Sequence, residues 1–211
     1  MLGRNSAYHQ QGFSLIEMML AITLGLGALL SLASVVGYGV GVNGKLLASN
    51  RLAEELNAVT SLMYRDVIRG GYNGDTVAMV TDPAASPSVF ANSITVSAFP
   101  GEAANSCILY AYDSNDNGVL DVVGSNENYG FRLRDDALEM RVGGAACDAG
   151  GWEDLSDLAV VRVTALVFTL NQSTVNNVTR TMVDINLTGE LSNNADFSRV
   201  YNYNLMVRNY D

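Results

Sequence analysis

Histidine and recognisable catalytic motifs are scarce in this sequence of 211 residues. The only histidine is His9, close to the N-terminus. A chain that has lost this region can build neither a Ser-His-Asp triad nor a histidine-containing zinc site. The sequence also has no glycine-rich phosphate-binding loop. Its many carboxylates leave acid–base chemistry by a carboxylate pair open, although none stands in a recognisable arrangement. We therefore expect a protein that is not an enzyme.

Basic residues are also few. Twelve Lys and Arg residues oppose 22 Asp and Glu residues, which gives a formal net charge of −10. General binding to nucleic acids or anionic lipids depends on basic side chains that neutralise phosphates. Nucleic acid is therefore not an expected partner.

Charged residues are absent from Met18 to Val42, and this run is almost wholly apolar. At about 1.5 Å per residue, a helix of this length exceeds the ~30 Å hydrocarbon core of a bilayer. The run is predicted to span a membrane. A secretory signal would be cut after its apolar stretch, whereas here a polar leader with Arg4 comes before it. We expect cleavage after Gly12 and an N-terminus in the cytoplasm, since the next basic residue is Lys45.

One carboxylate, Glu17, lies at the start of the apolar run. A charged side chain at membrane depth costs on the order of 3 kcal/mol or more, so an acid here indicates a function and a partner. The alternative is an acid without a role near the membrane face.

Gly12, followed by Phe13-Ser14-Leu15-Ile16-Glu17 and an apolar helix, resembles the class III signal of type IV prepilins and type II secretion pseudopilins. The resemblance implies that a prepilin peptidase cuts after Gly12 and methylates the new amino terminus on Phe13. It also gives Glu17 the role of the family's acid. In a filament, the carboxylate of Glu17 could pair with the amine of Phe13 in a neighbouring subunit, which would offset two desolvation costs together.

The residues after the apolar run form a helical pattern. Apolar residues recur at three- and four-residue spacing from Leu46 to Ile68 among charged residues, which predicts an amphipathic helix. No proline interrupts residues 13–69, so one helix of roughly 80 Å is predicted. Its membrane or filament-core half is 13–44, and its amphipathic half, 45–70, would pack on a globular head. Gly70-Gly71 is expected to end it.

Residues 71–211 are predicted to form a head domain with one antiparallel sheet, because branched and aromatic residues alternate with polar ones between turns. Residues 73–92 are predicted to be a connecting loop. The fold class is therefore α+β and pilin-like, with a long N-terminal helix packed on the sheet and a leader at 1–12. The predicted strands are 93–99, 107–112, 119–123, 129–134, 137–142, 158–170, 181–191 and 200–207.

Later parts of the sequence resemble PilW-type minor pilins. The matching stretches are Arg69-Gly70-Gly71-Tyr72, Cys107-Ile108-Leu109-Tyr110 leading into Tyr112-Asp113, Trp152-x-x-Leu155, and Val207-Arg208-Asn209. The resemblance implies a minor pilin that works with other minor pilins and the major pilin in pilus assembly, twitching motility and adhesion. It would wait in the bacterial inner membrane with its head in the periplasm, until the assembly machinery moves it into the pilus. A type II secretion pseudopilin and a membrane-tethered, calcium-dependent adhesin or binding module that does not polymerise are alternatives.

Cys107 and Cys147 are the only cysteines. An even pair in an exported domain predicts one disulfide. Two reduced, buried thiols are the alternative.

The stretch Asp113-Ser114-Asn115-Asp116-Asn117-Gly118-Val119-Leu120-Asp121 places oxygen-bearing side chains at alternate positions, with glycine sixth. This is a partial match to a calcium-binding loop, with Asp113, Asn115, Asn117 and Asp121 as ligands. The twelfth position is Gly124 rather than glutamate, although Glu127 or a distant carboxylate would be a substitute. An Asn- and Asp-rich turn explains the same composition, and both interpretations stay open.

Overall fold

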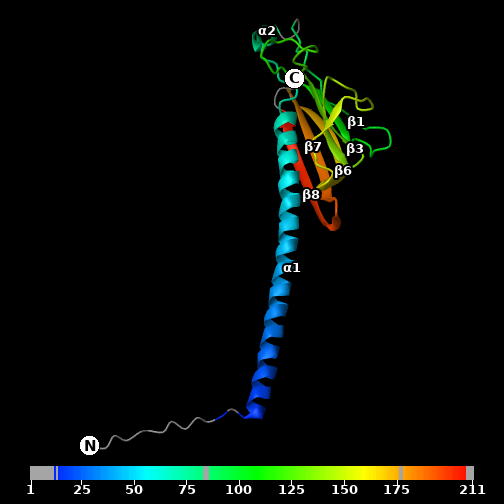
Figure 1. Ribbon diagram of the computed structural model, residues 1–211. Coiled ribbons are helices and arrows are strands. Elements are labelled where there is room, and N and C mark those ends of the chain that lie inside the picture. Colours follow the sequence, from blue (N-terminus) through cyan, green and yellow to red (C-terminus); the bar gives the residue numbers. More distant parts are fainter. Residues whose placement is uncertain (1–11, 13, 83–85, 176–177, 208–211) are drawn as a thin grey trace, which may run out of the picture. The chain divides into compact units, whose positions relative to one another are not determined.

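The structure is a computed structural model that describes residues 12, 14–82, 86–175 and 178–207. Its internal contacts divide the chain into two units, Met1–Leu47 and Ala48–Asp211. Helix α1, Leu15–Val67, belongs to both units (Figure 1). The predicted uninterrupted helix is therefore confirmed, with ends two and three residues inside those expected.

The first unit consists, in its described part, of the first portion of α1. Its leucine, isoleucine and valine side chains are exposed. Among the described residues, α1 is the one helix that is long and apolar enough to cross a membrane.

In the second unit, α1 buries one stripe of its surface. The buried side chains are Leu52, Leu56, Val59, Thr60, Met63 and Val67. Their three- and four-residue spacing is that of an amphipathic helix, as predicted. The helix ends where the N–H of Gly70 donates to the carbonyl of Val67 at 3.0 Å. Gly71 follows with a φ of 80°, a conformation that glycine adopts without steric cost.

Two antiparallel sheets form the rest of the second unit, not the single sheet predicted. The first has the order β1-β2-β3-β4-β5 and the second the order β6-β7-β8. The strands of the first are β1 Thr95–Ser97, β2 Cys107–Ala111, β3 Asn128–Arg134, β4 Ala137–Arg141 and β5 Trp152–Asp154. Those of the second are β6 Val161–Val175, β7 Val178–Leu191 and β8 Asn194–Val207.

The ladder does not continue from the first sheet to the second because β6 reaches turn residues instead of a strand. The N–H groups of Val163 and Phe168 donate to the carbonyls of Asp136 and Asn105, both at 2.8 Å. Asp136 and Asn105 have φ values of 66° and 63°. A left-handed backbone does not belong to a strand, so these bonds connect the sheets without merging them.

One hydrophobic core joins α1 to both sheets. Leu56 of α1 lies against Gly189 of β7, where an added Cβ would approach the leucine side chain to 2.7 Å. The hydroxyl of Tyr203 on β8 lies 3.3 Å from that of Thr60. In Figure 1 this cyan part of α1 runs beside the orange and red strands β7 and β8. The missing side chain at Gly189 thus lets α1 pack closely on the second sheet.

Two local predictions were wrong, and one strand was missed. Residues 119–123 form a loop, because side-chain oxygens accept the backbone N–H groups that a strand ladder would need. The N–H of Val119 donates to Asn117, and that of Asp121 to Glu127. The predicted connection 73–92 contains a short helix, α2 Thr76–Thr81. Strand β5 was not predicted, since its three residues are too few for an alternating pattern.

Candidate functional site

The predicted processing region lies at the start of α1. Gly12 is exposed, whereas Phe13 and residues 1–11 lie outside the described residues. The N–H of Ser14 donates to Oε2 of Glu17 at 3.0 Å. A glutamate three residues after a helix-capping serine accepts such a bond in a capping box. Glu17 therefore caps the helix, a role that the Ser-x-x-Glu spacing could have predicted.

Polar side chains in the apolar part of α1 are satisfied within the helix. The hydroxyls of Thr23, Ser31 and Ser34 donate to backbone carbonyls three or four residues earlier, at 3.0, 2.9 and 3.0 Å. Such bonds remove the cost of exposing these groups to hydrocarbon. The surface of this segment is therefore suited to lipid or to other apolar helices.

The predicted disulfide between Cys107 and Cys147 is present, with a Cα–Cα distance of 6.2 Å. Cys107 begins β2, and Cys147 lies in the loop of residues 142–151 between β4 and β5, here named the disulfide loop. Both cysteines are buried. The bond therefore ties the disulfide loop to β2 of the first sheet.

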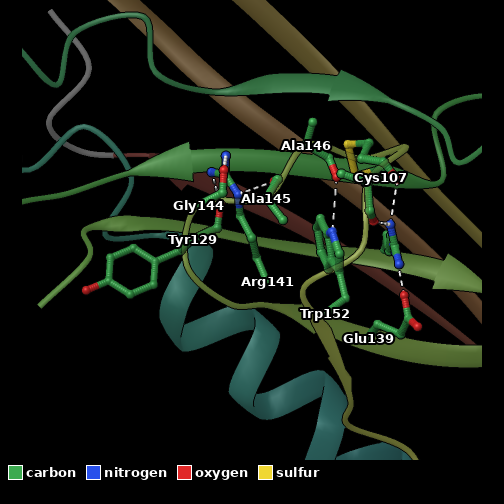
Figure 2. Close-up of a disulfide and its surroundings, with 11 residues drawn as sticks. Cys107, Tyr129, Glu139, Arg141, Gly144, Ala145, Ala146 and Trp152 are labelled. Atoms are coloured by element: carbon green, nitrogen blue, oxygen red, sulfur yellow. Dashed lines mark hydrogen bonds and ion pairs between the residues drawn. A yellow bond between two sulfur atoms is a disulfide. The ribbon is translucent and has the colours of Figure 1, made fainter. Parts of the chain in front are cut away.

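A buried arginine that was not among the predicted site residues holds the same loop. Arg132 of β3 forms an ion pair with Glu139 of β4. Its Nη1 donates to the carbonyls of Cys147 and Ala149 at 2.7 and 2.8 Å. The guanidinium carbon lies 4.5 Å from the ring centroid of Trp152, and Glu139 and Trp152 are labelled near Cys107 in Figure 2. Sequence gives no signal for this burial, because a lone arginine on a strand is usually exposed.

Arg141 holds the other side of the disulfide loop (Figure 2). Its Nε donates to the carbonyl of Ala145 at 2.6 Å, and its Nη2 donates to that of Gly144 at 2.7 Å. The indole N–H of Trp152 donates to the carbonyl of Ala146 at 3.1 Å. Burial lowers the pKa of Arg141. Side chains therefore donate hydrogen bonds to successive backbone carbonyls of the disulfide loop.

A second network joins the end of α1 to the first sheet. Asp66 accepts hydrogen bonds from the hydroxyls of Tyr110, at 2.5 Å, and Tyr112, at 2.8 Å. Burial, and next the Asp66 carboxylate, raise the pKa of both tyrosines well above the usual value, so both stay protonated donors. Arg69 lies over the Tyr112 ring, 4.0 Å from its centroid. These contacts fix the position of the helix end on the sheet.

The predicted calcium-binding residues are brought together in the loop after β2. Asp113 is buried. Its Oδ2 accepts from the N–H groups of Gly74 and Gly118 at 3.0 and 2.7 Å, and its Oδ1 accepts from that of Asn117 at 3.2 Å. Burial raises the pKa of the Asp113 carboxyl, but these backbone donors outweigh it, and the net pKa lies below the usual value.

The other predicted ligands also accept hydrogen bonds within the loop. Oδ2 of Asp121 accepts from the side-chain amides of Asn115 and Asn117 at 2.8 and 3.0 Å. Glu127 is buried, and its Oε1 accepts from the N–H of Ser114 at 2.7 Å. In the part of the chain that the structure describes, no three acidic, histidine or cysteine side chains are placed to hold a metal ion. Two of the predicted ligands are asparagines, which do not belong to these residue types. Calcium binding therefore stays a prediction.

Two models of known protein families match this chain. The model of the family described as prepilin peptidase-dependent protein B matches residues 45–207, and the prokaryotic N-terminal methylation motif matches residues 8–34. Searches among curated proteins and among solved structures found no match. The two family matches cover the predicted processing region, most of α1 and both sheets. The chain belongs to the prepilin peptidase-dependent protein B family and is a type IV pilin-like protein.

Proposed function

We propose that this protein is a minor pilin that helps to initiate assembly of type IV pili and is incorporated into them. The observation that carries the proposal is the exposed apolar surface of α1, which begins at an acid within a methylation motif. An apolar surface of this kind is stable only in lipid or against other apolar helices. The protein would act by assembly with other minor pilins and the major pilin rather than by catalysis.

The proposed sequence of events begins in the inner membrane. The first part of α1 spans the bilayer, with the N-terminus in the cytoplasm and the second unit in the periplasm. Prepilin peptidase cuts between Gly12 and Phe13 and methylates the amine of Phe13. The assembly machinery then moves the helix from lipid into the filament, where it packs among equivalent helices and carries the head to the pilus surface.

Glu17 sets the register of this packing. Its carboxylate would pair with the Phe13 amine of a neighbouring subunit, which offsets two desolvation costs at once. The structure supports a second role, because Glu17 also caps its own helix through Ser14. The two roles have different requirements: a cap needs only an acceptor oxygen, whereas a salt link needs a negative charge.

Glu17→Gln separates these roles, because glutamine retains the acceptor and loses the charge. We expect Glu17→Gln to lower piliation as much as Glu17→Ala, while both variants remain in the membrane. Counting filaments by electron microscopy and detecting the protein in membrane fractions would measure this. Normal piliation with Glu17→Gln would show that the cap is sufficient, and would overturn the salt link.

The N-terminus of the mature chain tests the processing step directly. Mass spectrometry of the protein from purified filaments should give a chain that begins at methylated Phe13. A chain that still begins at Met1 would contradict the proposal, because the amine would then lie far from Glu17.

Deletion of the gene distinguishes the pilus from the related secretion system. Loss of surface pili and twitching with normal release of exoproteins is expected. Loss of exoprotein release with normal pili would assign the protein to type II secretion instead. If the protein stays in the inner membrane and is absent from purified filaments, it is a tethered binding module.

A further inference from the structure

Two Asn-Gly sequences lie next to each other although they are far apart in the chain. They are Asn73-Gly74, which follows α1, and Asn117-Gly118, which follows β2. The N–H groups of Gly74 and Gly118 both donate to one oxygen, Oδ2 of Asp113, at 3.0 and 2.7 Å. An added Cβ on Gly118 would lie 3.6 Å from the side-chain oxygen of Asn73. One carboxylate therefore holds the backbone nitrogen that follows each asparagine.

That nitrogen is the reacting atom in spontaneous deamidation. The backbone nitrogen after an asparagine attacks the side-chain amide carbon, a C–N bond forms, and ammonia leaves. Water then opens the resulting succinimide to aspartate or isoaspartate, so the reaction needs no oxidant or cofactor. Glycine in the following position favours the attack, because it has no side chain to hinder the approach and gives the backbone unusual freedom.

The asparagine side chains are held as well. Oδ1 of Asn73 accepts from the N–H of Asp75 at 2.9 Å, and Oδ1 of Asn117 accepts from that of Val119 at 2.7 Å. The amide nitrogen of Asn117 also donates to Asp121 at 3.0 Å. Each amide is therefore fixed in its own turn, and the two turns are of one type. In each, the side-chain oxygen accepts from the N–H two residues later. Ring closure would require breaking this bond and the bond to Asp113.

We infer that Asp113 protects both Asn-Gly sequences from deamidation by holding the two glycine nitrogens, and that Asn73 and Asn117 are latent modification sites. Conversion of Asn117 to aspartate would replace its hydrogen bond to Asp121 with repulsion between two carboxylates. The product would therefore disrupt the loop that Asp113 organises.

The first measurement uses the unmodified full-length protein in detergent with a metal chelator. It is incubated at mildly alkaline pH and then mapped by mass spectrometry, beside peptides from a digest incubated in the same way. Asn73 and Asn117 should deamidate at least about tenfold more slowly in the folded chain than in the peptides. This factor corresponds to one hydrogen bond to a charged group. Equal rates in protein and peptides would overturn the inference.

Two matched variants then test whether Asp113 itself is responsible. Asp113→Asn removes the charge at the shared acceptor and should accelerate deamidation at both sites. Asp121→Asn changes a carboxylate in the same loop that does not contact the glycine nitrogens, so Asn73 should keep its slow rate. Equal acceleration of Asn73 in both variants would show that general loosening of the loop is responsible, and would refute the role of Asp113. If Asp113→Asn does not fold, the comparison between protein and peptides still decides whether the sites are protected.

Discussion

Removal of the disulfide tests what holds the first sheet together. Cys107 and Cys147 are 40 residues apart in sequence. In the chain-entropy model, a crosslink over this separation stabilises by about 4 kcal/mol, because it limits the freedom of the unfolded chain. In a chain of this size, a loss of that magnitude lowers Tm by roughly 8–16 °C. Cys107→Ser combined with Cys147→Ser should therefore produce this shift in thermal or urea unfolding of the full-length protein.

The same variant should leave the disulfide loop in place in the folded state. Arg132 donates to the carbonyls of Cys147 and Ala149, and Arg141 donates to those of Gly144 and Ala145. These bonds do not involve sulfur, so they persist when the disulfide is absent. Hydrogen exchange of residues 142–151 under native conditions should change little, even though global stability falls.

Arg132→Met is the matched comparison, because it retains the disulfide and removes the arginine. It leaves Glu139 buried without its partner, which costs about 3–5 kcal/mol. It also removes the donor to two carbonyls, so exchange in the disulfide loop should increase. Rapid exchange in the disulfide loop of the folded cysteine-free variant, together with slow exchange in Arg132→Met, would show that the disulfide rather than Arg132 holds the loop.

Three further outcomes are expected. Asp66→Ala leaves the Tyr110 hydroxyl buried without its acceptor and should lower the free energy of unfolding in urea by about 1–3 kcal/mol. Adding Tyr110→Phe should recover part of this loss. Strictly additive losses in the double variant would contradict the contact. Because the folded-state pKa of Asp113 is lowered, its stabilisation is present above the unfolded-state pKa and is lost as pH falls through the folded value. Asp113→Asn should therefore lower stability at neutral pH and reduce the further loss of stability in acid, as measured by unfolding at several pH values. An unchanged dependence of stability on acid pH would argue against this role. If the loop of Asp113 and Asp121 binds calcium, Tm should rise with calcium and fall again with chelator; the absence of any shift would leave only the turn.

The accuracy of the sequence predictions followed the range of the interactions involved. Helix α1 was predicted within three residues at each end, because its apolar periodicity and lack of proline are local properties. The cysteine pair was predicted because only one pairing exists. Residues 119–123 were wrongly predicted as a strand, because alternation alone does not show that Glu127 takes a backbone donor of the segment. The division into two sheets was missed for a related reason, since it depends on turn residues that meet β6 from other parts of the chain.

By itself, the sequence determined the membrane-compatible helix, its capping glutamate, the N-terminal methylation motif and the β-rich head with one disulfide. These properties depend on consecutive residues or on simple counting. The tertiary structure alone decided that Arg132 is buried under the disulfide loop, that Asp66 accepts from two tyrosines, and that Asp113 holds the nitrogen of the distant Gly74 as well as that of Gly118. The bonds to Asp66, the bond between Gly74 and Asp113, and the bonds from Arg132 to the disulfide loop join segments that are at least 15 residues apart. Their partners are therefore set by how the chain packs, which the order of residues along one strand or loop does not reveal.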